Sequence, residues 1–225
     1  MRFAIVLAVL ACLAVPARAE LGQGEYLPLL LIEDGGIGLG SDCLSERRPT
    51  RPTGELDVVP GTGVVAGDAE RVVRYVVEVE RGLPVDPDCF ARVVELTLSD
   101  ERSWIGSGAF GVQRVDDGSV DLRVTLASPS TVDRYCLPLR TGGIFSCWDG
   151  RRAMLNVWRW ENGATDFEGK LAEYRTYMIN HEVGHGFDHG HRDCPAAGEP
   201  APIMMQQTKT TGACEPNGWP TPAER

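Results

Sequence analysis

The four histidines of the chain all lie in one short stretch, from His181 to His191. His181 and His185 are four residues apart, so on a helix their imidazoles project from one face toward a single metal ion. Glu182 follows His181 directly and completes the pattern H-E-x-x-H, in which the glutamate stands beside a metal-held water as general base. The stretch therefore predicts the chemistry of a zinc hydrolase, with Zn²⁺ as cofactor.

A third metal ligand must come from beyond this pair. If the helix continued to His189, that residue would lie about 12 Å along the axis from the first ligand, too far for a compact tetrahedral site. We therefore expect the helix to end after His185, with Gly186 and Gly190 letting the chain turn back. The returning chain can then bring either His189 or His191 to the metal.

The pattern needs a helix to carry it, and the sequence predicts one. Apolar residues from Leu171 to Met178 recur at spacings of three and four, and His181 continues the row. We expect a long helix over residues 168–185.

The elements that position this helix lie upstream. Alternating apolar residues predict a half-buried strand over residues 71–80, and Asp86 is a helix-start residue ahead of a helical apolar pattern. Two strands are predicted at 109–115 and 121–127, joined as a hairpin, and another at 153–160. This order predicts an α+β fold with a mixed or antiparallel sheet.

Residues 1–19 have the features of a secretory signal peptide. Arg2 supplies a charge, an apolar run follows, and Ala17-Arg18-Ala19 is a cleavage site. The apolar run is shorter than the roughly 20 residues needed to cross a membrane, so we expect no membrane span. Cys12 leaves one alternative, a lipid-anchored N-terminus. Either reading implies a secreted or extracytoplasmic protein.

The rest of the chain is acidic and long enough for one domain. Residues 20–68 show little periodicity and many Gly, Pro and charged residues, so we expect an irregular N-terminal segment ahead of a single domain over 69–225. The net charge of the chain is −10 at pH 7, and the predicted signal contains arginines but no acids. Because this charge repels nucleic acid and no basic cluster offsets it, we exclude nucleic acid as a partner.

Six cysteines remain once Cys12 is set aside with the signal. An even number in an exported chain indicates disulfides, which can pair in many ways. We expect the pairing that follows the chain, Cys136–Cys147 and Cys194–Cys214, which leaves Cys43–Cys89. A zinc–thiolate site is the competing interpretation, but the sequence contains no C-x-x-C pair.

The histidine stretch also resembles the motif of the metzincin zinc peptidases, H-E-x-x-H-x-x-G-x-x-H followed by a turn with a methionine beneath the metal. The resemblance implies that His181, His185 and His191 are the metal ligands and Glu182 the general base. It also implies that Met204 occupies the methionine turn, with Met205 as its rival. The implied fold is a metzincin-like catalytic domain with a mixed sheet, a long active-site helix and a disulfide-stapled C-terminal segment.

A narrower resemblance covers Tyr177 to Pro220, which is similar to an uncharacterised family of secreted bacterial metzincin-like proteins. In chain order, the shared features are Asn180 to His185, Cys194-Pro195, Met204 before Gln206-Gln207-Thr208, Cys214, and Trp219-Pro220. The likeness extends more loosely back to Arg71, and the first 50 or so residues of the processed chain are not covered.

Two residues depart from the metzincin pattern. Asp188 stands where the motif has glycine, at a position that takes a left-handed turn, which aspartate tolerates. We interpret Asp188 as a solvated turn residue rather than as a hydrogen-bond acceptor for a ligand. Gln206 stands where some metzincins have a tyrosine that reaches the metal, so a tyrosine-assisted mechanism is not expected.

The resemblance implies a secreted zinc metallopeptidase that hydrolyses peptide bonds of peptides or proteins with a zinc-activated water and Glu182 as base. The substrate would extend along a sheet edge supplied by a strand within 109–127 or 153–160. The alternative is a secreted, zinc-stabilised, non-catalytic binding or scaffold protein. A third hypothesis, a latent enzyme, requires Cys43 as a free thiolate on the zinc. Substrate specificity and oligomeric state are left open.

Overall fold

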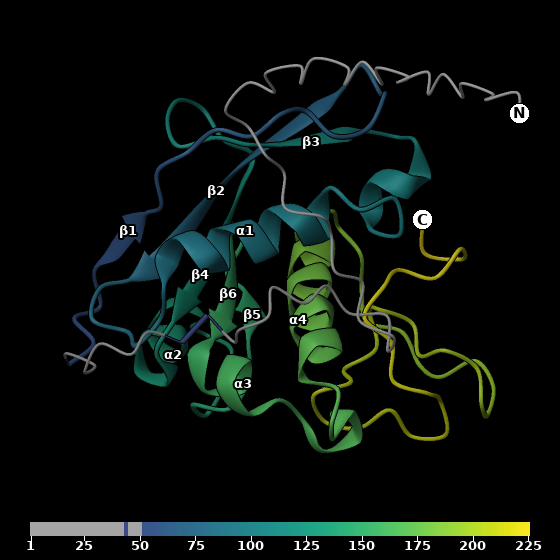
Figure 1. Cartoon of the computed structure of the whole chain (residues 1–225). Helices are drawn as coiled ribbons and strands as arrows, with labels where there is room; N and C mark the ends of the chain where they lie inside the picture. The colour runs from purple at the N-terminus through teal and green to yellow at the C-terminus, as the bar shows by residue number, and fades with distance from the viewer. Residues whose placement is uncertain (1–42, 45–50) are drawn as a thin grey trace, which may run out of the picture.

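The structure, a computed structural model, describes residues 43–44 and 51–225. The predicted signal peptide and most of the predicted irregular segment lie outside these residues. A six-stranded sheet forms the centre of the described chain (Figure 1). Its strands are β1 (Leu56–Val58), β2 (Val72–Glu80), β3 (Gly111–Arg114), β4 (Leu122–Ala127), β5 (Cys147–Trp148) and β6 (Arg152–Asn156). The helices are α1 (Pro87–Leu98), α2 (Pro129–Tyr135), α3 (Val157–Asn162) and α4 (Leu171–Gly186), with short 3-10 turns η1 (Trp104–Ser107) and η2 (Thr165–Phe167).

The sheet is mixed, as the sequence predicts. Its strands lie in the order β1-β2-β4-β6-β5, and β3 also pairs with β2. The pairs β2–β3, β2–β4 and β4–β6 are parallel, whereas β1–β2 and β5–β6 are antiparallel. Tyr75 pairs with Arg114 of β3 and with Leu122 of β4, so these two strands lie on opposite edges of β2.

The predicted hairpin between residues 109–115 and 121–127 is therefore wrong. Both strands exist, but β2 lies between them and each is parallel to it. Alternation identifies a half-buried strand without identifying its neighbour, because the same pattern suits any partner on either edge. The loop from Val115 to Asp121 thus passes over β2 at Arg74 and Tyr75, where β3 ends on one side of β2 and β4 begins on the other, instead of closing a hairpin.

The strand predicted at 153–160 is too long. β6 ends at Asn156, whose side chain accepts a hydrogen bond from the Trp158 N–H at 3.0 Å and caps α3. Asparagine is among the strongest helix caps, so the chain changes from strand to helix within an apolar run. The strand predicted over 71–80 and the helix start at Asp86 are confirmed: β2 spans Val72–Glu80, and Asp86 caps α1.

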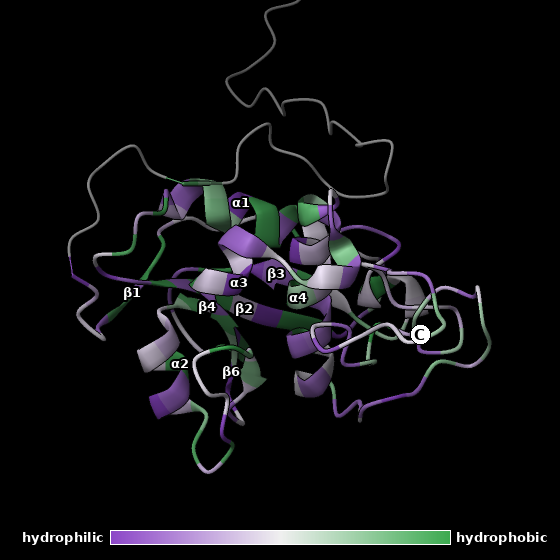
Figure 2. Ribbon diagram, turned by 90° about the horizontal axis from the view of Figure 1, so that it is seen from below, coloured by the Kyte–Doolittle hydropathy of each residue, from purple (hydrophilic) through white to green (hydrophobic). Residues whose placement is uncertain are grey.

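The two faces of the sheet pack against different helices. Alternate residues of the central strands, among them Val77, Val124 and Leu155, join the core shared with α1 and α4. The residues between them face α2, where Ala127 and Met154 form a smaller cluster. Figure 2 shows α1 and α2 on opposite sides of the strands. The alternation seen in the sequence thus separates two buried layers.

α4 runs through the middle of this structure. It spans Leu171–Gly186, close to the predicted 168–185, and every residue from Glu173 to Gly184 is buried. Such a helix is held by packing on all sides, which fixes the direction of each side chain. In the part of the chain that the structure describes, no helix has the length and apolar character required to cross a membrane.

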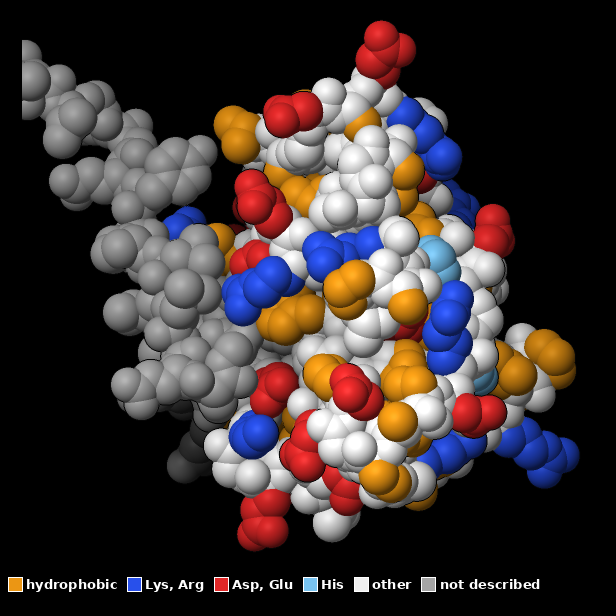
Figure 3. Space-filling view, turned by 90° about the vertical axis from the view of Figure 1, so that its right-hand side faces the viewer, with side chains coloured by type: hydrophobic (Ala, Val, Ile, Leu, Met, Phe, Trp, Pro, Cys, Tyr) orange, Lys and Arg blue, Asp and Glu red, His pale blue; other side chains and the backbone are white. Residues whose placement is uncertain are grey.

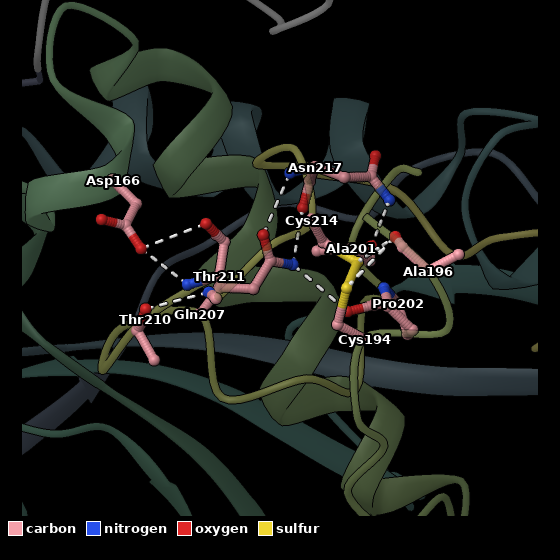
Figure 4. Close-up of a disulfide and its surroundings, with 11 residues drawn as sticks. Asp166, Cys194, Ala196, Ala201, Pro202, Gln207, Thr210, Thr211, Cys214 and Asn217 are labelled. Atoms are coloured by element: carbon pink, nitrogen blue, oxygen red, sulfur yellow. Dashed lines mark hydrogen bonds between the residues drawn. A yellow bond between two sulfur atoms is a disulfide. The ribbon is translucent and has the colours of Figure 1, made fainter. Parts of the chain in front are cut away.

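Residues 187–225, the C-terminal segment, contain no helix or strand and lie beside α4 (Figure 1). The segment is held by a Cys194–Cys214 disulfide and by buried amides (Figure 4). Gln207 donates to the carbonyls of Pro202 and Asn217 and accepts from the Asn217 N–H. The pairs Cys43–Cys89 and Cys136–Cys147 complete the disulfides, so the chain-order pairing is confirmed and Cys43 is not free.

Candidate metal centre

α4 places two histidines of the motif one turn apart. The His181 and His185 rings have centroids 4.9 Å apart and are nearly perpendicular. His181 is buried, whereas His185 is partly exposed near the end of the helix. Two imidazoles on a rigid helix can therefore face one ion without further ordering.

The chain reverses directly after α4. The His189 N–H donates to the Gly184 carbonyl at 3.0 Å, which closes the last turn. Asp188 has a φ of 65°, the left-handed conformation expected at the position where the metzincin motif has glycine. Its side chain is exposed, as for a solvated turn residue.

This reversal selects His191 and not His189 as the third member of the cluster. Ligand nitrogens of His181, His185 and His191 all lie within 4.8 Å of one another. The His189 ring instead stacks on Trp104, with centroids 4.4 Å apart. Of the two candidates that helix geometry left open, the structure brings His191, the one that the resemblance implies, to the helix pair.

Backbone carbonyls fix the orientation of the two helical histidines. His181 Nδ1 donates to the Ile203 carbonyl at 2.8 Å, and His185 Nδ1 donates to the His189 carbonyl at 2.9 Å. A proton on Nδ1 leaves Nε2 as the lone-pair atom available to a metal. The protein thus pre-sets the tautomer that a ligand needs.

The same surroundings keep the cluster neutral. Burial, together with the neighbouring His185 and His191, lowers the pKa of His181 to about 3, although its bond to Ile203 opposes the shift. Burial likewise lowers the pKa values of His185 and His191. At neutral pH all three rings therefore present lone pairs and not positive charges.

Glu182 faces the same space. Its carboxyl group is buried, and burial raises its pKa to about 8. A carboxyl group in an apolar environment, next to three neutral imidazoles, holds or releases a proton near neutral pH. With a pKa of about 8 the group is mostly protonated at neutral pH, and a cation held by the neighbouring histidines would lower the pKa toward the carboxylate that a general base requires.

Met204 lies under the end of α4. It is fully buried, and an added Cβ on Gly184 would lie 2.5 Å from its sulfur. A turn across Pro202 and Met205 carries it, closed by a 2.9 Å backbone hydrogen bond. Met205 is only partly buried, so Met204 is the methionine of this turn that packs under α4.

A cavity of about 560 Å³ opens over the histidines. Its floor includes Glu182 and the three clustered histidines, and its walls come from the loop 139–148 and from residues 206–209. Gln206 lines this wall and accepts a hydrogen bond from Lys209, at the position where some metzincins have tyrosine. Figure 3, which views the molecule from the side of the C-terminal segment, shows histidine side chains at the surface amid charges of both signs.

The strand beside this cavity is β5, which the sequence did not predict. The expected edge strands within 109–127 and 153–160 are β3, β4 and β6; β4 and β6 are internal, and β3 pairs with β2. β5 ends the sheet on the side that contacts α4, and Trp148 packs under Gly186. Two residues in strand pairing give no periodic signal, so the sequence could not reveal β5.

Other contributors were also missed. Trp104 stacks on His189 and donates its indole N–H to the Asn180 carbonyl at 3.0 Å. The Tyr177 hydroxyl donates to the Met205 carbonyl at 3.1 Å. These residues look like ordinary core aromatics in the sequence, and only their partners, distant along the chain, reveal their place at the site.

The donor set fits zinc. Three neutral imidazoles, of which His181 and His185 have Nδ1 bonded to a backbone carbonyl, match the nitrogen ligands of catalytic zinc sites, which leave a fourth position open. The cavity over the cluster provides room for that position.

Residues 46–222 match the family DUF3152, described as a protein of unknown function, and the chain belongs to this family. No curated protein and no solved structure matches the chain.

Proposed function

We propose that this DUF3152 protein is an exported, metzincin-like zinc peptidase. The observation that carries the proposal is the convergence of His181, His185 and His191 on one point, with Glu182 facing the same cavity. Neither the histidine cluster without a base nor a buried glutamate without a metal site would support amide hydrolysis. Together they supply a metal-binding site and a base at one place, the combination that amide hydrolysis requires.

Three imidazoles would hold the ion, and Glu182 would handle the proton. A bound zinc ion supplies Lewis acidity and lowers the pKa of a water toward about 7. The Glu182 carboxylate accepts a proton from the attacking water and later delivers it to the leaving amine.

The cavity walls support an extended peptide as substrate. β5 is the last strand of the described sheet on the cavity side, so its outer edge can accept a further strand. Arg140 and Lys209 line the same cavity. The three disulfides agree with export to an oxidising compartment, which the N-terminal sequence also predicts.

Zinc binding is tested by comparing His191→Ala with His189→Ala. Because only His191 joins the cluster, His191→Ala should lose most of the zinc affinity, and His189→Ala should retain it. Zinc content after dialysis measures both. Loss of the metal in His189→Ala with retention in His191→Ala would reject the proposed ligand set.

Activity is tested with Glu182→Gln in the zinc-loaded protein. Glu182 is not one of the three clustered ligands, so zinc content should equal that of the parent. Hydrolysis of a diverse peptide library should fall by about 10² to 10⁴, the usual contribution of positioned proton transfer. A chelator control identifies metal-dependent cleavage.

Equal cleavage by both proteins would point to a contaminant or to another base. Zinc binding without cleavage by either protein would favour the binding or scaffold function instead.

A further inference from the structure

Glu224, near the end of the chain, is a buried carboxylate with an unusual set of partners. Its side chain belongs to a residue only 4% exposed. Oε1 accepts from the Met204 N–H, and Oε2 accepts from the Ile203 N–H, each at 2.9 Å. Oε2 also accepts from the N–H and hydroxyl of Thr221. All these partners are donors, which suits an ionised carboxylate because it can only accept.

One peptide group links this carboxylate to the metal centre. The N–H of Met204 and the carbonyl of Ile203 belong to the same peptide unit. The N–H donates to Glu224, while the carbonyl accepts from His181 Nδ1 at 2.8 Å. Carboxylate, peptide and imidazole therefore form a continuous hydrogen-bonded chain.

Such a chain has electronic as well as geometric consequences. An anion at the N–H end polarises the peptide and strengthens the carbonyl as an acceptor, since hydrogen bonds in series reinforce one another in a low-dielectric interior. A stronger acceptor at Nδ1 makes Nε2 more basic, which is how carboxylates behind histidine ligands raise metal affinity. Here the carboxylate would act through a peptide and not by direct contact.

We propose that Glu224 is a positioning residue of the metal centre: through the Ile203–Met204 peptide it orients His181 and raises its affinity for the metal. The proposal rests on the metal-binding half of the proposed function and not on peptidase activity. It assigns a role at the centre to a residue that follows the histidine motif by more than 30 positions.

Other contacts hold the C-terminal segment in place, so a change at Glu224 does not have to release it. Trp219 is buried under the Arg102 guanidinium, 4.1 Å from the ring centroid. Arg225 donates to the Glu101 carbonyl, and the Cys194–Cys214 disulfide closes the segment. The effect on the metal can therefore be separated from loss of the fold.

The chain offers a matched control in Glu80. It is equally buried, at 1% exposure, and accepts from the Ser128 N–H at 2.6 Å, the Gly54 N–H at 2.7 Å and the Thr131 hydroxyl at 3.0 Å. It lies on the α2 face of the sheet, away from α4. Glu80→Gln therefore removes a buried carboxylate of the same type without touching the chain of bonds to His181.

The experiment compares zinc affinity in the full chain for the parent, Glu224→Gln and Glu80→Gln, by competition with a chelator at a temperature where all three are folded. Glutamine cannot accept at both positions, so Glu224→Gln should weaken zinc binding about 10-fold, the low end for residues behind metal ligands. Glu80→Gln should bind zinc as the parent does. An affinity loss shared by both variants would overturn the proposal, because it would reflect stability alone.

A second readout follows the hydrogen bond itself. In the zinc-loaded proteins the His181 Nδ1–H proton resonance should move upfield in Glu224→Gln, since its acceptor is weaker, while that of His185 stays in place. If Glu224→Gln does not fold, Thr221→Val, which removes one donor that orients the carboxylate, should give the same two changes at smaller amplitude.

Unchanged zinc affinity in a folded Glu224→Gln protein would overturn this proposal alone. A parent protein that binds no zinc would instead overturn the proposed function, and the proposal with it.

Discussion

The two parts of the molecule that meet at the histidine cluster are built by different means. The sheet and α4 contribute His181, Glu182 and His185 from a helix buried on all sides. The C-terminal segment contributes His191 and Met204 without any helix or strand. In the first part, the hydrogen bonds of the sheet and of the helices pair the backbone N–H and C=O groups. In the second, scattered backbone–backbone hydrogen bonds are supplemented by polar side chains, such as Gln207 around Pro202 and Asn217.

The difference shows that regular structure is not required for accurate placement. A segment that buries Ile203 and Met204 must find partners for their N–H groups, since an unpaired buried group costs about 1–3 kcal/mol. Glu224 provides both partners at once. The Cys194–Cys214 bridge then limits the conformations open to the unfolded segment. We expect the two parts to respond differently to perturbation.

The largest effect is expected from a cavity in the regular part. Phe90 is fully buried in α1 and packs edge-to-face on Trp160 with centroids 5.1 Å apart. Phe90→Ala should lower the free energy of unfolding by about 3–5 kcal/mol. Hydrogen exchange should then accelerate throughout the protein, because this core unfolds as a unit. Acceleration confined to α1 would show that the regular part is not one cooperative body.

Removing the disulfide of the C-terminal segment should have a smaller and local effect. The Cys194→Ala/Cys214→Ala double variant should lose about 3 kcal/mol, from a bridge with a sequence separation of 20. Exchange should accelerate mainly between residues 192 and 215, and zinc affinity should fall because His191 is less constrained.

The matched control is Cys136→Ala/Cys147→Ala, with a separation of 11. It should lose a similar free energy while zinc affinity holds. Equal zinc affinity in both double variants would argue that the segment does not depend on its bridge.

A substitution at the contact between the two parts should come next in size. Gly184 lies on α4 where an added Cβ would be 2.5 Å from Met204 Sδ and from a ring carbon of Trp104. Alanine normally stabilises a helix by about 0.5–1 kcal/mol over glycine. Overpacking costs about 1–3 kcal/mol, so Gly184→Ala should be destabilising overall. Urea unfolding measures whether Gly184→Ala lowers or raises the free energy of unfolding. A stabilised variant would mean that the two parts pack loosely here.

The smallest effect is expected at Gly190, between His189 and His191. Nothing lies within 4 Å of an added Cβ, and its backbone does not require glycine. Gly190→Ala should stabilise the protein by about 0.4–1 kcal/mol, because it restricts the unfolded chain. Zinc affinity should be unchanged. A marked loss of stability or of zinc affinity would show that the chain reversal after α4 needs the flexibility of glycine at this position.

The sequence determined the features that depend on near neighbours. The spacing of His181 and His185 and the course of the helix that carries them are local, so residue type and period sufficed to predict them, whereas the left-handed turn at Asp188 was implied by the resemblance to the metzincin motif. Alternation located β2 and β4, and the chain order of the cysteines matched the disulfides found. The role of the cluster as a zinc site remains a prediction.

Only the tertiary structure decided which distant segments meet. It separated β3 from β4 by β2, ended β6 at Asn156 and placed β5 beside the cavity. It brought His191, which the resemblance had implied, to the helical histidines, and it brought Glu224 to the peptide behind His181. These outcomes depend on strand pairing, aromatic stacking and hydrogen bonds between residues far apart in the chain. A local pattern is compatible with many such partners, and packing the whole chain selects one.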